Sequence, residues 1–302
     1  MDCILNILKP PGMTSFDVVA VVRHQLNGVK TGHAGTLDPI AAGVLPICAG
    51  KSTRLLEYIT ADEKRYTAEI TLGIETDTYD TTGTVVGVNK AIPGRENIIS
   101  AISGFIGEFD QIPPIYSAIK VDGRKLYESA RKGQTPEIKP RRITIHSINI
   151  KDVDGPKVIM DVHCSKGTYI RSLCHDIGAA LGCGATMSFL VRTSVGLFDI
   201  RDSLPVNELE SVISEGRIGD FLIHPRAVLN GFSEAVMEDD TVTRLLNGLK
   251  VPFSECMSVK QGDSDKNILA VYDKSDRIVA IAAHCNEGGI KTVKMAAGKS
   301  LI

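Results

Sequence analysis

The chain has 302 residues, is 43% hydrophobic and carries a formal net charge of −2. These values are typical of a globular protein with one large or two ordinary domains, and they argue against a protein that coats nucleic acid indiscriminately. No apolar run is long enough to span a membrane and no basic signal-peptide region begins the chain, so we expect a cytoplasmic protein without membrane contact. The seven cysteines form no Cys-x-x-Cys pair, which predicts reduced thiols and neither a disulfide framework nor a metal site.

The N-terminal part of the chain predicts a strand followed by a capped helix. Residues 4–8 form a short apolar run that ends at a Pro-Gly turn. Thr14 or Ser15 then caps a helix that ends at residues 27–28. The apolar stripe of this helix comprises Phe16, Val19, Val22 and Leu26.

Further along, strands and helices are interspersed. Strict alternation of apolar and polar residues over 66–73 predicts a strand with Tyr66 on its apolar face, where a core tyrosine is the plain interpretation. The other expected strands are residues 84–88, 143–150 and 158–164 and one that begins at residue 189. The expected helices are residues 95–106, 122–132, 169–182 and 200–214.

A change of pattern near Pro225 predicts a domain boundary. Beyond it the chain reads as short strands and turns, with a hairpin formed by residues 269–272 and 278–282. The interspersed strands and helices predict a main domain that contains both. A small β-rich domain is expected to follow it at the C-terminus.

One segment of the chain is strongly basic. Residues 120–142 hold eight Lys or Arg and three Asp or Glu, a net charge of +5 on a chain that is otherwise acidic. A single basic patch on an acidic body suits the docking of one particular polyanion. The alternative is the solvated face of a helix.

A glycine-punctuated segment, residues 32–51, contains one carboxylate, Asp38, among small and apolar residues. An ionised carboxylate in such surroundings needs a cation or a donor. Asp38 followed by proline also fits a helix N-cap, so a simple capping role is an alternative. A phosphate-binding loop ending at Lys51-Ser52 is disfavoured, because Leu45 stands where that motif requires glycine.

Arg171 is the candidate partner for Asp38. It falls in the first turn of the expected helix over 169–182, where a cation faces the positive end of the helix dipole. This placement is favourable when a carboxylate from elsewhere in the chain lies opposite, although a solvated arginine would also account for it.

Five motifs follow one another along the chain, namely NILKPPGMTS at 6–15, GHAGTLDPIAAGVLP at 32–46, KRY at 64–66, YSAIK at 116–120 and CSKGTYIR at 164–171. In this order they resemble the motifs of one enzyme family, the bacterial tRNA pseudouridine-55 synthases of the TruB type. The resemblance covers about the first 200 residues, and the tail is similar to the small RNA-binding PUA domain.

The resemblance implies the α+β pseudouridine synthase fold, with a mixed, largely antiparallel central sheet flanked by helices and a small β-rich C-terminal domain. It also implies a division of the chain and a role for each matching residue. Residues 1–225 would be the catalytic domain, residues 116–142 would include a thumb-like insertion that grips RNA, and residues 226–302 would be the PUA-like domain. Asp38 would be the catalytic aspartate, paired with Arg171. The surrounding residues would stack on the uracil (Tyr66), line the pocket (Tyr169), form its apolar wall (Leu190), hold the T-loop (His33) and support the site structurally (Lys9). The family often has two arginines after Leu190, and here Val191 precedes Arg192.

The function implied is the isomerisation of one uridine, position 55 in the T-loop of tRNA, by a monomer that needs neither a cofactor nor a metal. A carboxylate held ionised by Arg171 suits attack on carbon or stabilisation of an electron-poor sugar, and a flipped base can stack on Tyr66. The alternatives are a non-catalytic RNA-binding or tRNA-folding protein, a nucleotide-dependent phosphotransferase and a related synthase acting on another RNA.

Overall fold

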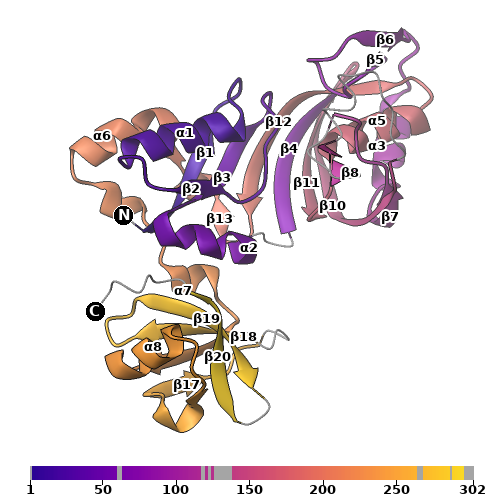
Figure 1. Ribbon diagram of the computed structural model, residues 1–302. Helices are drawn as coiled ribbons and strands as arrows, with labels where there is room; N and C mark the ends of the chain where they lie inside the picture. Colours follow the sequence, from indigo (N-terminus) through magenta and orange to yellow (C-terminus); the bar gives the residue numbers. More distant parts are fainter. Residues whose placement is uncertain are drawn as a thin grey trace.

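The computed structural model describes residues 2–59, 63–116, 120–121, 124–125, 138–263, 268–285 and 288–295. The chain forms two main β-sheets, a large one that helices cover and a smaller one near the C-terminus (Figure 1). Within the described residues, no helix is both long enough and apolar enough to cross a membrane.

The large sheet has ten strands, eight of which follow in the order β14-β1-β3-β12-β4-β11-β10-β7, while β2 pairs with β3 and β13 with β12. Neighbours are antiparallel except for the β1–β14 and β3–β12 pairs. The expected mixed, largely antiparallel sheet is therefore confirmed. The strands are β1 (Cys3–Lys9), β2 (Thr31–His33), β3 (Ala42–Ala49), β4 (Glu63–Leu72), β7 (Gly107–Gln111), β10 (Arg141–Asp154), β11 (Lys157–Ser165), β12 (Ala185–Val195), β13 (Phe198–Asp199) and β14 (Leu204–Pro205).

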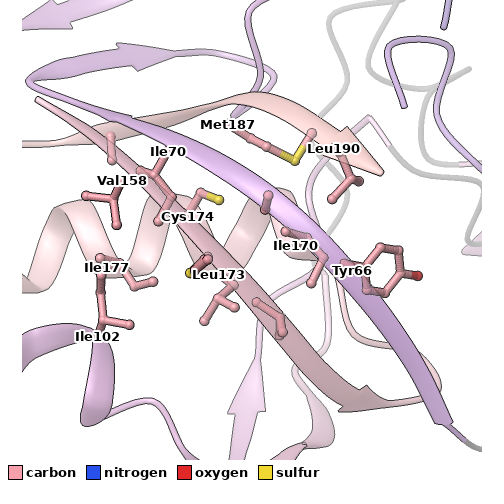
Figure 2. Packing of buried hydrophobic residues seen from close by; sticks show 14 of the residues in the cluster. Tyr66, Ile70, Ile102, Val158, Ile170, Leu173, Cys174, Ile177, Met187 and Leu190 are labelled. Atoms are coloured by element: carbon pink, nitrogen blue, oxygen red, sulfur yellow. The ribbon is translucent and has the colours of Figure 1, made fainter. Parts of the chain in front are cut away.

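One face of this sheet packs against the helices α3 (Arg95–Ser103) and α5 (Ile170–Ala180). The apolar residues of β4 alternate as expected and point toward α5, while Ile177 and Ile102 join the two helices to the sheet (Figure 2). Full burial of such a side chain contributes about 1.5–3 kcal/mol, so this cluster is a main source of stability. Tyr66 and Leu190 lie at one end of it.

Strands β1 and β3 are covered on both faces. On one face they pack against α1 (Ser15–Gln25) and α6 (Leu209–Ser214). The expected cap of α1 is present, since the Thr14 hydroxyl accepts from the backbone N–H of Asp17. The expected stripe is confirmed at Val22 and Leu26 but is wrong at Phe16, which is 68% exposed, because Val18 faces the sheet in its place.

Two expected helices differ in the structure. Residues 200–214 are divided into η2 (Ile200–Asp202), β14, η3 (Val206–Glu208) and α6, because Pro205 lacks an N–H and disfavours a helical residue before it. A helix beginning at residue 122 is also wrong, since β8 (Lys120–Val121) pairs with β9 (Arg124–Lys125). Residues 126–132 lie outside the described part of the chain.

Shorter elements connect these strands and helices. The strands β5 (Ile74–Thr76) and β6 (Val85–Val88) form a small hairpin beside β12. The short helical segments are η1 (Gly50–Leu55), α2 (Leu56–Ile59) and η4 (Ile218–Phe221).

The smaller sheet has the strand order β16-β20-β19-β18-β15-β17. The expected hairpin is confirmed as β18 and β19, whereas α8 (Asp239–Leu246), whose Val242 and Leu245 face the sheet, was not anticipated. A shared apolar cluster, which includes Tyr272, joins this sheet to β1 and β3. The helix α7 (Pro225–Val228) lies between the two sheets, and the domain boundary at residues 225/226 stays a prediction. The strands are β15 (Ser233–Met237), β16 (Val251–Pro252), β17 (Ser258–Lys260), β18 (Ile268–Asp273), β19 (Ile278–Cys285) and β20 (Gly289–Met295), with η5 (Phe253–Glu255) between β16 and β17.

Strand β3 was missed in the sequence because it contains Pro46, which cannot donate to a ladder. The proline falls between the residues that pair with β12 and those that pair with β2, so its missing N–H leaves both ladders intact. At the start of the strand, Gly43 has a φ of +118° and lies against the backbone of Arg192. The loop between β2 and β3, which carries Asp38, is thereby anchored at its C-terminal end.

We expect Gly43→Ala to lower the free energy of unfolding by about 3 kcal/mol or more, because a Cβ would overlap the carbonyl oxygen of Arg192 and the backbone angle is strained for alanine. Gly28→Ala is the matched control: its φ of +78° carries backbone strain of about 1–2 kcal/mol, and no atom lies within 4 Å of the added methyl group. Urea denaturation of both variants measures the difference. Equal destabilisation would contradict the close packing of β3 against β12.

Candidate active site

The loop that carries Asp38 is held by backbone contacts. The Ala41 N–H donates to the Asp38 carbonyl at 3.0 Å, which closes a turn over residues 38–41. On one side the buried hydroxyl of Ser15 accepts from the Leu37 N–H at 2.9 Å, and on the other the Gly12 N–H donates to the Pro39 carbonyl at 2.8 Å. The alternative of a helix N-cap is wrong, because no helix follows Asp38.

Arg171 lies at the start of α5 with its side chain only 5% exposed. Its terminal nitrogens donate to the carbonyls of Thr78 at 3.1 Å and Tyr116 at 2.9 Å. Its Nε lies 2.8 Å from Asp38 Oδ2, so the two side chains form an ion pair. The angle at the Nε–H does not suit a hydrogen bond to this oxygen. The pair expected from the sequence is therefore present, and the carboxylate offsets the unfavourable position of the cation in the helix dipole.

A second carboxylate, Asp80, shares this guanidinium and was not identified from the sequence. Its Oδ2 lies 3.6 Å from Arg171 Nε, and its side chain is 5% exposed. Its Oδ1 accepts from the Thr78 hydroxyl and from the Thr82 N–H, both at 2.9 Å. In the sequence, residues 76–83 are a polar loop with four threonines and two aspartates, and nothing in this composition marks Asp80 as the buried one.

Asp38 and Arg171 lie in an open cleft with a volume of about 420 Å³. Five of the seven predicted site residues line it, namely Asp38, Tyr66, Tyr169, Arg171 and Leu190. Two cationic residues that the sequence did not single out as site residues, Lys64 and Arg141, also line this cleft. The cleft thus combines an anchored carboxylate, an aromatic ring, an aliphatic wall and cations at its border.

The side chain of Tyr66 is hydrogen-bonded to that of the buried Arg192. Burial raises the pKa of Tyr66 to about 12. Its hydroxyl is therefore protonated at neutral pH. Arg192 also donates to the carbonyls of Val44 at 2.8 Å and Gly35 at 3.0 Å. This single arginine joins the aromatic residue of the cleft to both ends of the Asp38 loop.

The backbone of Tyr169 is fixed by a buried amide. Gln111, at the end of β7, accepts from the Tyr169 N–H at 2.8 Å and donates to its carbonyl at 3.1 Å. Because Tyr169 immediately precedes α5, these two bonds position the first turn of the helix and, with it, Arg171.

Lys9 and His33 do not line the cleft. The ring of His33 meets Phe16 edge-on, with the ring centroids 5.4 Å apart, and its Nδ1 is buried without a hydrogen-bond partner in the described part of the chain. Burial lowers the pKa of His33, so the ring is neutral at neutral pH.

Sequence comparisons identify the family. The model of the TruB family pseudouridylate synthase N-terminal domain matches residues 23–170, and that of the tRNA pseudouridylate synthase B C-terminal domain matches residues 171–227. A Clostridium kluyveri protein named tRNA pseudouridine synthase B is 47% identical over 281 residues, which cover 93% of this chain and 95% of that protein. A protein of the same name from Clostridioides difficile is 43% identical over 98% of this chain and 99% of its own length. The chain belongs to the TruB family of pseudouridylate synthases.

Solved structures agree with this assignment. The TruB-family chain is similar to a chain in a Cbf5-Nop10-Gar1 complex, with 26% identity and a TM-score of 0.73 over 98% of this chain and 85% of that one. A chain of an H/ACA RNP bound to a substrate RNA containing 2'-deoxyuridine has the same fold, with 24% identity and a TM-score of 0.72. The match covers 99% of this chain and 86% of that one. The expected pseudouridine synthase fold and the expected enzyme class are confirmed.

In the TruB-family enzyme, Lys9 holds the Asp38 loop through a hydrogen bond to the carbonyl of Pro39. Its side chain is fully buried, and Nζ donates to the carbonyls of Met13 at 2.6 Å, Pro10 at 2.9 Å and Pro39 at 3.3 Å. Burial lowers the pKa of Lys9 to about 8, against the opposing effect of the nearby Asp38 carboxylate. Burying this lysine costs hydration free energy, and its three hydrogen bonds fix the carbonyls of residues 10, 13 and 39 beside the site.

The stability due to Lys9 should rise with pH. The pKa of Lys9 is about 8 in the folded chain and has its usual value of 10.5 in the unfolded chain. Between these two pH values the unfolded chain therefore binds more protons than the folded chain. The free energy of unfolding of the wild type relative to Lys9→Met should therefore increase by up to about 3 kcal/mol between pH 8 and 10.5. Urea denaturation at several pH values measures it. Lys30→Met, at an exposed lysine, is the control, and the same pH dependence for both variants would contradict the prediction.

Proposed function

We propose that this TruB-family enzyme converts the uridine at position 55 in the T-loop of tRNA into pseudouridine, with Asp38 as the catalytic residue. The observation that carries the proposal is the 2.8 Å ion pair between Asp38 and Arg171 in the cleft. The relatives of matching length are named tRNA pseudouridine synthase B, which supports tRNA as the substrate. The position within tRNA and the role of the aspartate are what the proposal adds.

The reaction breaks the bond between C1′ and N1 of the uridine and joins C1′ to C5. C5 then loses a proton and N1 gains one, so the product is an isomer and the reaction needs neither a cofactor nor a metal. An anionic group beside the sugar can attack carbon or stabilise an electron-poor sugar. Arg171 holds one oxygen of Asp38, and the carboxylate side chain is 34% exposed, which leaves it accessible from the cleft.

The base must leave its stack to reach this carboxylate, at a cost of a few kcal/mol. The ring of Tyr66 and the side chain of Leu190 provide a stacking partner and an apolar wall that offset part of this cost. Tyr169 completes the lining next to Arg171. Splayed bases of this kind occur in RNA loops, which favours a T-loop as the target.

The rest of the RNA meets cationic groups. Lys64 and Arg141 border the cleft, where they can contact phosphates, and the basic segment over residues 116–142 would grip the T arm as a thumb-like insertion. His33 would contact the T-loop outside the cleft, and the PUA-like domain, residues 226–302, would add further RNA contacts. The enzyme would act as a monomer.

Asp38→Asn should reduce turnover by at least about 10³-fold, because the amide cannot supply the negative charge that the sugar requires. The affinity for tRNA should stay within about tenfold, since the phosphate contacts are untouched. Release of tritium from tRNA labelled with [5-³H]uridine measures the chemistry, and filter binding measures the affinity.

Two controls separate the parts of this proposal. Asp152→Asn, at an exposed aspartate on β10, should release tritium at the wild-type rate. A transcript with cytidine at position 55 should release none from its other uridines. Turnover by Asp38→Asn would contradict the role of the aspartate, and release from the cytidine transcript would contradict the position.

Arg171→Lys should lower kcat by about 10²-fold or more, because lysine keeps the charge but cannot contact Asp38 and the carbonyls of residues 78 and 116 together. Arg201→Lys is the matched control, since Arg201 also lies 2.8 Å from an aspartate, Asp199, but its side chain is 83% exposed. Single-turnover kinetics compares the two variants. An equal and small effect of both would show that the buried geometry is not needed.

A further inference from the structure

Three potential metal ligands meet on the side of the large sheet away from the cleft. Glu63 lies on β4, His146 on β10 and His163 on β11, which are neighbouring strands. One ligand atom from each lies within 4.8 Å of the other two. His163 Nε2 is 2.9 Å from Glu63 Oε2, and His146 Nε2 is 3.9 Å from Glu63 Oε1.

The strand register explains how these residues come together. Along β4, Lys64 and Tyr66 face the cleft, so Glu63 projects to the opposite side. In β10 the pairing with β11 shifts between residues 145 and 147, which leaves His146 as an extra residue. A bulge of this kind re-aims a side chain. Here it leaves His146 exposed, with its ring 4.7 Å from that of His163, centroid to centroid.

Two imidazoles and one carboxylate are the ligand set of several catalytic zinc sites, in which a water completes the coordination. In a tetrahedral site with metal–ligand bonds of about 2.0–2.1 Å, the ligand atoms stand about 3.4 Å apart. The present spacing needs only small side-chain rotations to reach this. The side chains are 58%, 35% and 17% exposed for Glu63, His146 and His163, so a metal ion has a direct path to them.

The charges around the cluster are mixed. Arg65 pairs across the strands with His163 and shares its face of the sheet, so its positive charge weakens the attraction for a cation. Further along the same face, Asp161 bonds to Lys151 and Thr67 and is not free to act as a ligand. The local field therefore favours moderate affinity and a metal with a strong preference for imidazole.

We propose that Glu63, His146 and His163 form a binding site for a divalent transition-metal ion of the zinc class. Imidazole suits Zn²⁺, Co²⁺ and Ni²⁺ and is a poor ligand for Mg²⁺ and Ca²⁺. The ion would join three neighbouring strands and stabilise the sheet behind the cleft. The cysteine spacing does not reveal this site, because its ligands are histidine and glutamate that lie far apart in the sequence.

Cobalt(II) is the probe, because its visible d–d absorption reports coordination by nitrogen and oxygen. Titration of the full-length, reduced protein should produce these bands, and Zn²⁺ should displace them. His146→Ala and His163→Ala should each lower the affinity for Co²⁺ at least tenfold, and Zn²⁺ should raise the melting temperature of the wild type but not of His146→Ala. His24→Ala, at an exposed histidine of α1 outside the cluster, should behave as the wild type.

The experiment has clear contrary outcomes. Unchanged Co²⁺ bands in both histidine variants, or no bands at all, would overturn the proposal. A sulfur-to-metal charge-transfer band would do the same, because it would assign the ion to the partly exposed Cys256 or Cys285. Melting curves in the presence of a chelator check that each variant is folded. Because His146 is exposed, His146→Ala still tests the proposal if His163→Ala is unstable.

Discussion

The buried guanidinium of Arg171 is the interaction on which the site depends. A charge that is only 5% exposed needs a charged partner, and removing one partner of such a pair typically costs about 3–5 kcal/mol. Its nitrogens meet the carbonyls of residues 78 and 116 and the carboxylates of Asp38 and Asp80. One cation therefore fixes three separate segments against the first turn of α5, and the position of Asp38 follows from that arrangement.

Two other buried cations act on the same loop in a different way. Lys9 and Arg192 bind backbone carbonyls, among them those of Pro39 and Gly35, rather than carboxylates. Because a carbonyl oxygen carries only a partial charge, these bonds orient the loop without neutralising the cations. The loop of Asp38 is thus surrounded by an excess of positive charge, a field that favours anionic groups and the approach of a polyanion such as RNA.

The Asp38–Arg171 pair could be predicted from the sequence because each residue is unusual in its own surroundings, one a carboxylate in an apolar loop and the other a cation at the wrong end of a helix. Strict alternation likewise gave the direction of Tyr66. Asp80 could not be found in this way, since a threonine-rich loop has the same composition whether it is solvated or folded around a carboxylate. The role of Arg192 depends on contacts more than 140 residues apart in the chain, which no local pattern records.

Strand β4 carries both sites described above, one on each face. Since successive side chains alternate, Lys64 and Tyr66 reach the cleft while Glu63 reaches His163 on the opposite face. The backbone of β4 is paired with β11 in continuous register over residues 63–71. A metal ion on the outer face would therefore add to a geometry that is already fixed, and its effect belongs to the stability of the sheet more than to the chemistry of the cleft.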